Sequence, residues 1–355
     1  MQATTLYRRP LPQGSVAFSS PEGRQLFAEA LAAGGMDAYF PLAEQFHTQA
    51  DPAFCGLGSL VVALNALGVD PGRLWKGPWR WFAEDLLDCC VPLEEVRRRG
   101  LDMDELACLA RCNGAEVELH RASQEGLASF RAAIAEPQTH AHVVIASYDR
   151  RELEQTGAGH FSPIGGYHAG RDLALILDVA RFKYPPHWVP IERLWQAMHS
   201  HDDATGKPRG YLVLRARGSG VALGFTLSCA NDGWPALSTR LRRVLADVTG
   251  AVELSTLALT VAPLAAYVEL RTPHAPLHAQ ALEQARSELR QVPAYAEIAA
   301  AVGGERAEVT TLLLCVLSQT LPGELRAALE SNGAALQREL HNLQAQIAAV
   351  ARLQR

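Results

Sequence analysis

Apolar and polar positions divide the chain into an early helical part and a later extended part. A helix start is predicted where serines precede Pro21 and Glu22, and a stop is predicted at Gly34. Farther along, the apolar runs are too short for buried helices and are bounded by turn residues, which favours strands. These runs cover residues 142–146, 173–177 and 211–214. Helices followed by a sheet indicate an α+β fold.

The pattern changes again near residue 217. Residues 217–220 have the composition of a linker, and Ala, Leu, Glu and Arg dominate beyond it. We therefore predict a first domain over residues 1–217 and a smaller, mainly helical domain over residues 218–355. A chain of 355 residues with 48% apolar composition is large enough to bury both cores.

The final segment carries one apolar stripe. Its apolar residues recur at spacings of four and three, which places them on one face of a helix. The stripe covers roughly two and a half heptads, short of the roughly three to four that indicate a coiled coil. Packing within its own domain is therefore favoured, and a homodimer is the alternative. The stripe consists of Leu336, Leu340, Leu343, Ile347 and Val350.

Charge and terminal sequence limit the classes of function. The formal net charge is -5 and charged residues make up 20% of the chain, so no basic field is present to bind nucleic acid. The first residues lack the apolar core of a signal peptide, and no run of about 18 uncharged apolar residues occurs. We expect a cytoplasmic protein without membrane partners that acts on small molecules or peptides.

The seven cysteines favour reduced thiols, because their number is odd and no secretory signal precedes them. Cys89 with Cys90, and Cys108 with Cys112, lack a second pair at zinc-finger spacing. Partly buried free thiols are the favoured interpretation, and weak binding of a soft ion such as cadmium is the alternative. No resident metal site is predicted.

The strongest chemical signal surrounds Cys55. An apolar helical pattern follows it directly, so the cysteine is predicted to open a buried helix. The N-terminal end of a helix carries partial positive charge, which favours the thiolate and lowers the thiol pKa. Six residues earlier, Gln49 is placed to form an oxyanion hole together with the Cys55 backbone N–H. This spacing is the arrangement of papain-type cysteine peptidases.

A base and an orienting carboxylate follow in the chain order of papain-like enzymes. His160 begins a predicted strand after glycines that allow close approach, and Asp178 ends the apolar run at 173–177. Taken singly, each residue has a structural alternative: an inert buried cysteine, a hydrogen-bonded histidine and a strand-end aspartate. Together with Gln49, the three predict a Cys–His–Asp nucleophilic site.

Long blocks of the sequence also resemble the catalytic domain of eukaryotic phytochelatin synthases, over nearly all of residues 6–229. The family's catalytic cysteine, histidine and aspartate fall on Cys55, His160 and Asp178, and its oxyanion glutamine falls on Gln49. The resemblance implies a papain-like cysteine peptidase fold for the first domain. The matching blocks are residues 6–9, 18–23, 70–73, 75–82, 87–90, 155–157, 159–167 and 175–188.

This resemblance implies a glutathione γ-glutamylcysteinyltransferase. Such an enzyme cleaves glycine from glutathione through a thioester on its cysteine, and passes the acyl group to a second glutathione or to a phytochelatin peptide. By the same resemblance, Arg150, Lys183 and Tyr184 line the glutathione site, where cations suit the two substrate carboxylates. No permanent cofactor is implied, since cadmium, zinc and copper ions act as activators bound to glutathione thiolates.

Two rival functions are left open. One is hydrolysis of glutathione or of its S-conjugates by the same triad, with water as the acceptor. The other is a thiol-rich metal-binding or sensor protein without turnover, which predicts cysteine clusters in the second domain. Plant members of the family carry cysteine pairs there, whereas this chain has only Cys229 and Cys315. We therefore expect the second domain to support the catalytic domain rather than to store metal.

Overall fold

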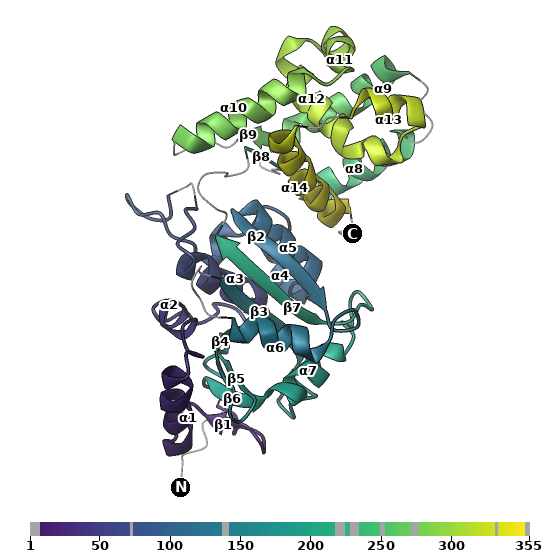
Figure 1. Cartoon of the computed structure of the whole chain (residues 1–355). Helices are drawn as coiled ribbons and strands as arrows, with labels where there is room; N and C mark the ends of the chain where they lie inside the picture. The colour runs from purple at the N-terminus through teal and green to yellow at the C-terminus, as the bar shows by residue number, and fades with distance from the viewer. Residues whose placement is uncertain are drawn as a thin grey trace. The chain divides into compact units, whose positions relative to one another are not determined.

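The computed structural model describes residues 8–71, 74–136, 142–216, 224–227, 234–248, 253–270, 276–330 and 333–351. The chain divides after Ala216 into two compact units, and the short segment Asp88–Pro92 groups with the second unit. Figure 1 shows most strands of the first unit in blue to teal and the helices of the second unit in green to yellow. The linker predicted at residues 217–220 lies outside the described residues.

A seven-stranded sheet organises the first unit. Its strand order is β1-β6-β5-β4-β3-β7-β2, and the neighbouring strands pair antiparallel. The three runs predicted as strands form β3, β5 and β7, so the α+β class is confirmed. The strands are β1 (Val16–Ala17), β2 (Ala115–Arg121), β3 (His142–Asp149), β4 (Gly159–His168), β5 (Leu173–Ile176), β6 (His187–Pro190) and β7 (Gly210–Ala216).

Two helices cover one face of this sheet. Helices α6 (Leu127–Ala135) and α7 (Ile191–His199) share a core with alternate residues of β3, such as Val144 and Tyr148. This alternation is expected because successive strand residues point to opposite faces. Every residue of β3 is buried, so both faces of this central strand are covered.

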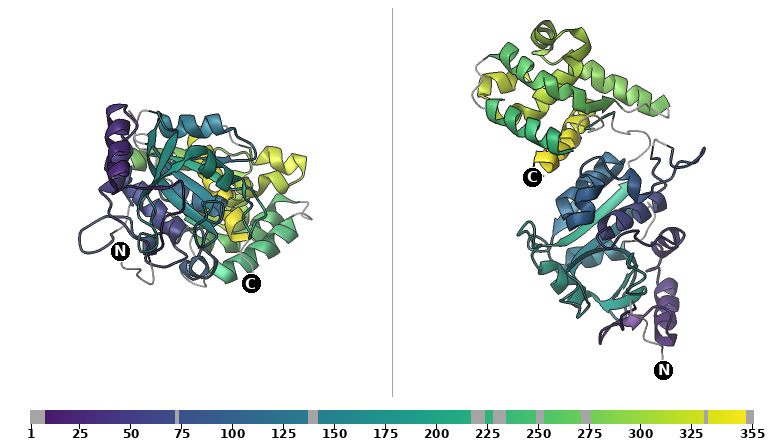
Figure 2. Two further views of the ribbon diagram at one scale, coloured as in Figure 1. Left: turned by 90° about the horizontal axis from the view of Figure 1, so that it is seen from below. Right: turned by 180° about the vertical axis from the view of Figure 1, so that it is seen from behind.

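The N-terminal helix packs on the other face. Helix α1 (Pro21–Ala32) begins as predicted, because Ser20 Oγ accepts a hydrogen bond from the Gly23 N–H (2.9 Å). Its residue Leu26 shares a second core cluster with Leu175 of β5, and the rear view in Figure 2 shows α1 in purple alongside the sheet. The remaining helices of this unit are α2 (Tyr39–Ala43), α3 (Cys55–Ala66), the short η1 (Glu84–Leu86), α4 (Leu93–Arg99) and α5 (Met103–Cys112).

Helices make up most of the second unit, which also holds a two-stranded sheet. Among the described residues, no helix is both long enough and apolar enough to span a membrane. The strands are β8 (Phe225–Leu227) and β9 (Val268–Leu270), and the helices are α8 (Trp234–Val248), α9 (Leu254–Val261), η3 (Ala262–Tyr267), α10 (Pro276–Arg290), α11 (Tyr295–Val302), α12 (Gly304–Leu317), η4 (Ser318–Thr320), α13 (Gly323–Ala328) and α14 (Ala334–Ala351).

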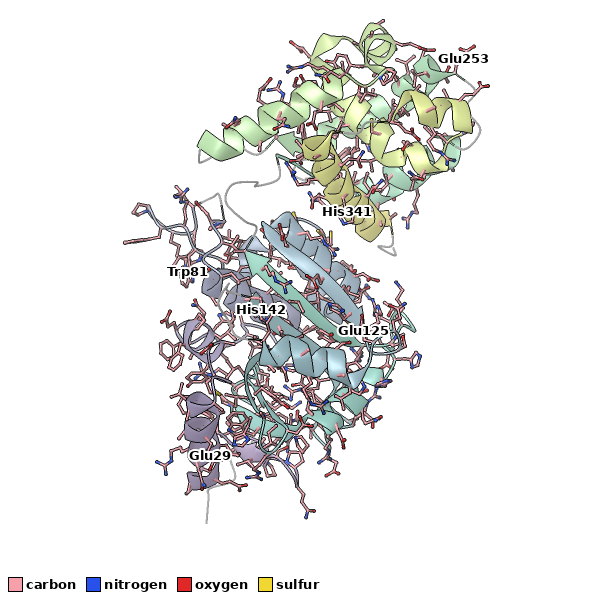
Figure 3. All side chains as sticks on the ribbon, viewed as in Figure 1. Glu29, Trp81, Glu125, His142, Glu253 and His341 are labelled. Atoms are coloured by element: carbon pink, nitrogen blue, oxygen red, sulfur yellow. The ribbon has the colours of Figure 1, made fainter. Side chains whose placement is uncertain are left out.

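Helix α14 carries the predicted apolar stripe, and all five stripe residues are buried within the unit. Its polar side chains complete the packing: Glu339 accepts hydrogen bonds from the backbone N–H groups of Gly224 and Phe225 (2.8 and 3.1 Å). His341, labelled in Figure 3, lies on the exposed side of the same helix. The helix therefore packs within its own unit, as the favoured interpretation predicts.

Candidate active site

Cys55 is the first residue of α3, as predicted. The first N–H groups of a helix have no acceptor within the helix, so they place partial positive charge beside the cysteine. Nine of the 12 residues of α3 are buried, and Ser59 Oγ donates to the Phe161 carbonyl oxygen of β4 (3.1 Å). The cysteine itself is partly exposed. The helix is thus fixed against the sheet, and its first residue is only partly buried.

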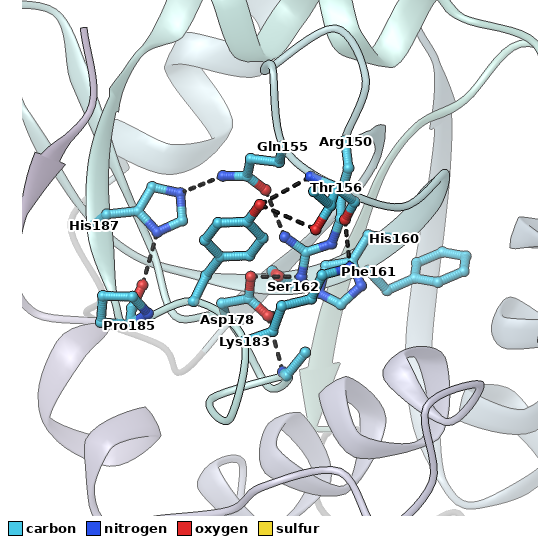
Figure 4. Close-up of polar contacts among 12 residues, drawn as sticks. Arg150, Gln155, Thr156, His160, Phe161, Ser162, Asp178, Lys183, Pro185 and His187 are labelled. Carbon is cyan, nitrogen blue, oxygen red and sulfur yellow. Dashed lines mark hydrogen bonds and ion pairs between the residues drawn. The ribbon is translucent and has the colours of Figure 1, made fainter. Parts of the chain in front are cut away.

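The structure brings His160 and Asp178 together with Cys55. His160 is the second residue of β4, and Asp178 follows β5, the strand that pairs with β4. His160 Nε2 lies 2.9 Å from Asp178 Oδ1 (Figure 4), and the imidazole is near enough to Cys55 to lower the pKa of its thiol. Because Nε2 donates to the carboxylate, Nδ1 is the ring nitrogen left for the thiol.

Electrostatics favour a thiolate–imidazolium pair. Burial opposes ionisation of Cys55, but His160, the Phe161 backbone and the Arg150 charge together lower the pKa of this thiol. Burial and the Arg150 charge oppose protonation of His160, but Asp178 and Cys55 raise the pKa of this imidazole above the usual histidine value. The two shifts favour separated charges near neutral pH.

Asp178 stays ionised beneath this pair. Burial opposes its charge, but His160 and Arg150 hold the pKa of this carboxyl well below the usual aspartate range. Besides the His160 bond, Oδ1 accepts from the Ala180 N–H (2.8 Å), and Oδ2 accepts from Arg150 Nη2 (2.6 Å). Three donors hold the carboxylate in one orientation, so the carboxylate can hold the imidazole in one orientation.

Gln49 lies in the loop that leads into α3. Its backbone N–H donates to the Val179 carbonyl oxygen beside Asp178 (3.0 Å), which ties the loop to the triad. Its buried Nε2 donates to the carbonyl oxygens of Asp51 (2.8 Å) and Pro52 (3.0 Å), and Oε1 has no hydrogen-bond partner among the described residues. Because both Nε2 protons are used in these bonds, the oxyanion role of Gln49 stays a prediction.

Glu84 anchors the same loop and was missed by sequence reasoning. Its buried carboxylate accepts from the Ala50 N–H (3.0 Å) and lies 2.9 Å from His47 Nε2. Gly58 of α3 lies against it, since a Cβ at Gly58 would meet Glu84 Oε1 at 3.1 Å. A single acid at the start of a short helix carries no local signal of this kind, because its partners are set by the fold.

Arg150, expected at the glutathione site, lies against the triad instead of at the surface. Only 2% of the residue is exposed. Nη2 donates to Asp178 and lies 2.8 Å from His160 Nε2, while Nη1 donates to Gln155 Oε1 (2.5 Å). Since the Nε2 proton of His160 is directed at Asp178, the approach of Arg150 acts on the imidazole mainly through its charge. Binding of substrate by Arg150 stays a prediction.

Lys183 and Tyr184 support the loop that carries Arg150. The Tyr184 hydroxyl accepts from the Thr156 N–H (2.8 Å), and the Arg150 guanidinium carbon lies 5.0 Å from the Tyr184 ring centre. Lys183 Nζ donates to the Thr156 carbonyl oxygen. Burial and the Arg150 charge lower the pKa of Lys183. Both residues thus lie beside the triad, and their contact with substrate stays a prediction.

Arg209 is a second buried arginine that sequence reasoning missed. A Cβ at Gly159, next to His160, would come within 2.5 Å of Arg209 Nη2. Nη1 pairs with Asp202 Oδ2 (3.0 Å), whereas Nε has no hydrogen-bond partner within the described ranges. A buried guanidinium with an unused donor beside the triad suits a substrate carboxylate. In the sequence it is an isolated arginine with no motif around it.

The cysteines correct one prediction. Cys55 and Cys315 are free, and burial raises the pKa of Cys315 to about 12. From the sequence, four other cysteines were predicted to be free thiols, and this prediction was wrong. The odd number of cysteines does not decide pairing, because disulfides form where the fold brings buried sulfur atoms close together. The sulfur atoms of Cys89, Cys90 and Cys112 lie within 4.8 Å of one another, but a soft ion binds thiolates and therefore requires reduction of the disulfides first. Cys229 lies outside the described residues. The disulfide-bonded residues are Cys89, Cys90, Cys108 and Cys112.

Fold and site together define an α+β protein with a Cys–His–Asp triad at the start of a buried helix. A family model described as phytochelatin synthase matches residues 6–211. This match covers more than half of the chain, which therefore belongs to the phytochelatin synthase family.

Curated relatives share one name. Glutathione gamma-glutamylcysteinyltransferase 1 of Triticum aestivum is 52% identical over 240 residues, which are 67% of this chain and 48% of that protein. The protein of the same name from Arabidopsis thaliana is 50% identical over 244 residues, 68% of this chain and 50% of that protein. Glutathione gamma-glutamylcysteinyltransferase of Schizosaccharomyces pombe is 40% identical over 259 residues, 72% of this chain and 62% of that protein. The chain thus spans about half the length of the plant relatives.

Proposed function

We propose that this protein is a glutathione γ-glutamylcysteinyltransferase. The observation that carries the proposal is the Cys55–His160–Asp178 triad, in which hydrogen bonds and charges favour a thiolate. A thiolate beside an imidazolium can attack an amide carbonyl and form a thioester. The substrate is inferred from the names of the relatives. The sequences of these relatives match the part of the chain that holds the triad.

We also assign the first unit to the papain-like cysteine peptidase fold. The support is the arrangement of the triad on the fold: the cysteine opens a helix that packs on an antiparallel sheet. The histidine lies on one strand of that sheet, and the aspartate follows the neighbouring strand. The chain order Cys, His, Asp agrees with this assignment.

In the first half-reaction, the Cys55 thiolate attacks the carbonyl carbon of the Cys–Gly amide in glutathione. The negative charge on the carbonyl oxygen is stabilised by the Cys55 backbone N–H and by Gln49 Nε2, which must turn from the Asp51 and Pro52 carbonyl oxygens. His160 Nδ1 gives its proton to the glycine nitrogen as the C–N bond breaks. Glycine leaves, and a γ-glutamylcysteinyl thioester remains on Cys55.

In the second half-reaction, the α-amine of another glutathione, or of a phytochelatin peptide, attacks the thioester carbonyl. His160 Nδ1 accepts the amine proton, the C–S bond breaks and the Cys55 thiolate is restored. Asp178 holds Nε2 through both steps and balances the imidazolium charge. Water in place of the amine gives hydrolysis by the same steps.

The substrate carboxylates need cationic partners near the triad. Arg209 offers a buried Nε without a partner among the described residues, and Lys183 offers an ammonium beside Gly157. Cadmium, zinc and copper ions enter as part of the acceptor, because a metal bound by glutathione thiolates neutralises their charge. The metal is then substrate, and no resident ion is required.

The test is to incubate the purified protein with glutathione, with and without cadmium, and to follow glycine release and peptide mass. A Cys55→Ser variant is the control. Metal-stimulated (γ-Glu-Cys)n-Gly peptides that disappear in this variant support the transferase. Glycine release without longer peptides identifies a hydrolase instead, and the absence of glycine release refutes the catalytic site.

A further inference from the structure

A buried chain of hydrogen bonds continues from Asp178 of the triad through Arg150 and Gln155 to His187 (Figure 4). It begins at Arg150, whose guanidinium is a planar fork of donors with no acceptor. One branch of the fork, Nη2, donates to Asp178 Oδ2 (2.6 Å), and the other, Nη1, donates to Gln155 Oε1 (2.5 Å). The position of the guanidinium against Asp178 therefore depends on what holds Gln155.

Gln155 is held in one orientation. Because Arg150 only donates, the Gln155 atom that faces it must be the oxygen, and Nε2 must point the other way. Nε2 lies 3.0 Å from His187 Nε2. The backbone N–H of Gln155 also donates to the Arg150 carbonyl oxygen (2.8 Å), so the two residues close one tight turn between β3 and β4.

His187 is the last residue in this chain of hydrogen bonds, and it is a neutral acceptor. Its Nδ1 lies 2.8 Å from the Pro185 carbonyl oxygen, which only accepts, so Nδ1 carries the proton. Nε2 is then unprotonated and accepts from Gln155. The residue is the first of β6 and is fully buried, and burial lowers its pKa, which favours the same neutral form. Each hydrogen bond along the chain Arg150 to Gln155 to His187 thus has a defined donor and a defined acceptor.

We propose that Gln155 and His187 are positioning residues for the Cys55–His160 pair. Neither touches the thiol or the imidazole, and both act through Arg150, which they hold against Asp178 and His160. The proposal deepens the proposed function and rests on it, because it concerns the same triad.

The consequence of losing the chain follows from the charge on Arg150. This charge lowers the pKa of Cys55 and opposes protonation of His160. If the guanidinium moves away from the triad, the pKa values of the thiol and the imidazole both rise. In a plot of reaction rate against pH, the rising limb set by the thiol and the falling limb set by the imidazole then both move toward higher pH. A general loss of packing does not shift both limbs in this way.

Other charged and titratable groups surround the pair and stay constant in this comparison. Burial raises the pKa of Tyr148, so its hydroxyl is neutral and hydrogen-bonds Ser162 Oγ (3.2 Å). Lys183 is partly exposed, and the Arg150 charge acts on it. Among the described residues, the groups that act electrostatically on Cys55, His160 or Arg150 and are unchanged in the variants include Asp178, Tyr148 and Lys183.

The experiment compares the full-length wild type with Gln155→Met and His187→Gln. Gln155→Met keeps the side-chain length and removes both hydrogen bonds. The rate at which iodoacetamide alkylates Cys55 is measured against pH, with mass spectrometry to identify the modified residue. We expect the acid limb to lie at higher pH in both variants. We also expect kcat for glycine release to fall about 10- to 100-fold, as for a misplaced catalytic group, with little change in KM.

Two further variants sharpen the result. His142→Gln is the matched control, because His142 is also a buried strand histidine with Nε2 on a carbonyl oxygen, that of Ala133 (3.0 Å), but contacts none of the three chain residues. Its profile should match the wild type. Gln155→Glu keeps an acceptor for Arg150, so its kcat should lie closer to the wild type than that of Gln155→Met.

The proposal is overturned if folded Gln155→Met and His187→Gln lose only thermal stability and keep the wild-type alkylation profile. Folding is checked by circular dichroism, and if Gln155→Met does not fold, Gln155→Glu and His187→Gln decide. Alkylation needs no glutathione, so a wild type that shows an ordinary acid limb for its thiol overturns the positioning role. If Cys55 of the wild type is alkylated at lower pH than an ordinary thiol but the protein does not turn over glutathione, only the proposed function is refuted.

Discussion

At the residue scale, the chemistry depends on which member of the Cys55–His160 pair holds the proton. Helix α3 contributes positive partial charge at Cys55, and Asp178 contributes a negative charge behind His160. Both act in the same direction and favour thiolate with imidazolium. Burial acts against both charges, so the balance depends on Asp178 keeping its three donors.

The pH dependence of the wild type tests this balance. The pKa of Cys55 is lowered, so the thiolate appears at lower pH than in an ordinary cysteine; the pKa of His160 is raised, so the imidazolium persists to higher pH than in an ordinary histidine. We predict a kcat/KM profile for glycine release that rises through the lower apparent pKa and falls through the upper one. A single limb at the pKa of a free thiol would contradict the ion pair.

Gln49 offers a second test at this scale. If Gln49 Nε2 stabilises the oxyanion, Gln49→Ala should lower kcat by about 100- to 1,000-fold, as for loss of an oxyanion donor. Alkylation of Cys55 passes through no oxyanion, so its rate should change little. Equal loss of both rates would assign Gln49 a structural role, through its bonds to Asp51 and Pro52.

At the element scale, the turn between β3 and β4 organises the site. The strands pair Tyr148 with His160 and Asp149 with Gly159, and the Arg150 N–H closes the turn on the Ala158 carbonyl oxygen (3.0 Å). The nine residues of the turn, 150–158, supply Arg150 and Gln155, and His160 follows as the second residue of β4. The two strands hold its ends, so its shape is transmitted to the triad.

Gly157 is the residue on which the shape of this turn depends. Its φ is +111°, and a Cβ there would meet Lys183 Nζ at 3.1 Å and Arg150 Cδ at 3.4 Å. We expect Gly157→Ala to destabilise the protein by about 1–3 kcal/mol, as strained backbone does, and to lower kcat by displacing Arg150. Denaturant unfolding and glycine release measure the two effects.

Gly206 provides the matched control for this substitution. It also has positive φ, +65°, but a Cβ there would meet nothing within 4 Å. Gly206→Ala should therefore carry the backbone cost without the effect on kcat. A similar loss of kcat in both variants would show that the contacts of Gly157 have no part in positioning Arg150.

At the scale of the whole molecule, the site belongs to one unit. Cys55, His160 and Asp178, and all residues described above as contacting them, precede residue 217. The second unit buries its own apolar stripe on α14 and contributes none of the described contacts to the triad.

A chain that ends at Ala216 tests this separation. We predict that the truncated protein keeps the wild-type pH profile of Cys55 alkylation, because the charges that set it remain. Its thermal stability should fall, since the segment Asp88–Pro92 loses the unit with which it groups. A folded truncated chain whose Cys55 titrates as an ordinary thiol would show that the second unit shapes the site.

The sequence by itself determined the parts of this protein that depend on near neighbours. The serine cap before Pro21 predicted the start of α1, short apolar runs predicted β3, β5 and β7, and the apolar pattern after Cys55 placed the thiol at a helix start. These signals work because capping and periodicity are settled within a few residues.

The tertiary structure alone decided which distant side chains meet. Strand pairing places His187 behind Gln155, the fold brings Glu84 to the loop before Cys55, and Arg209 reaches Gly159 from another strand end. The disulfides at Cys89, Cys90, Cys108 and Cys112 were likewise decided by the fold and not by the local sequence. At the triad, burial and the neighbouring charges shift the pKa values of Cys55, His160 and Asp178, because charges interact strongly only where water is excluded. No local pattern in the sequence records where that happens.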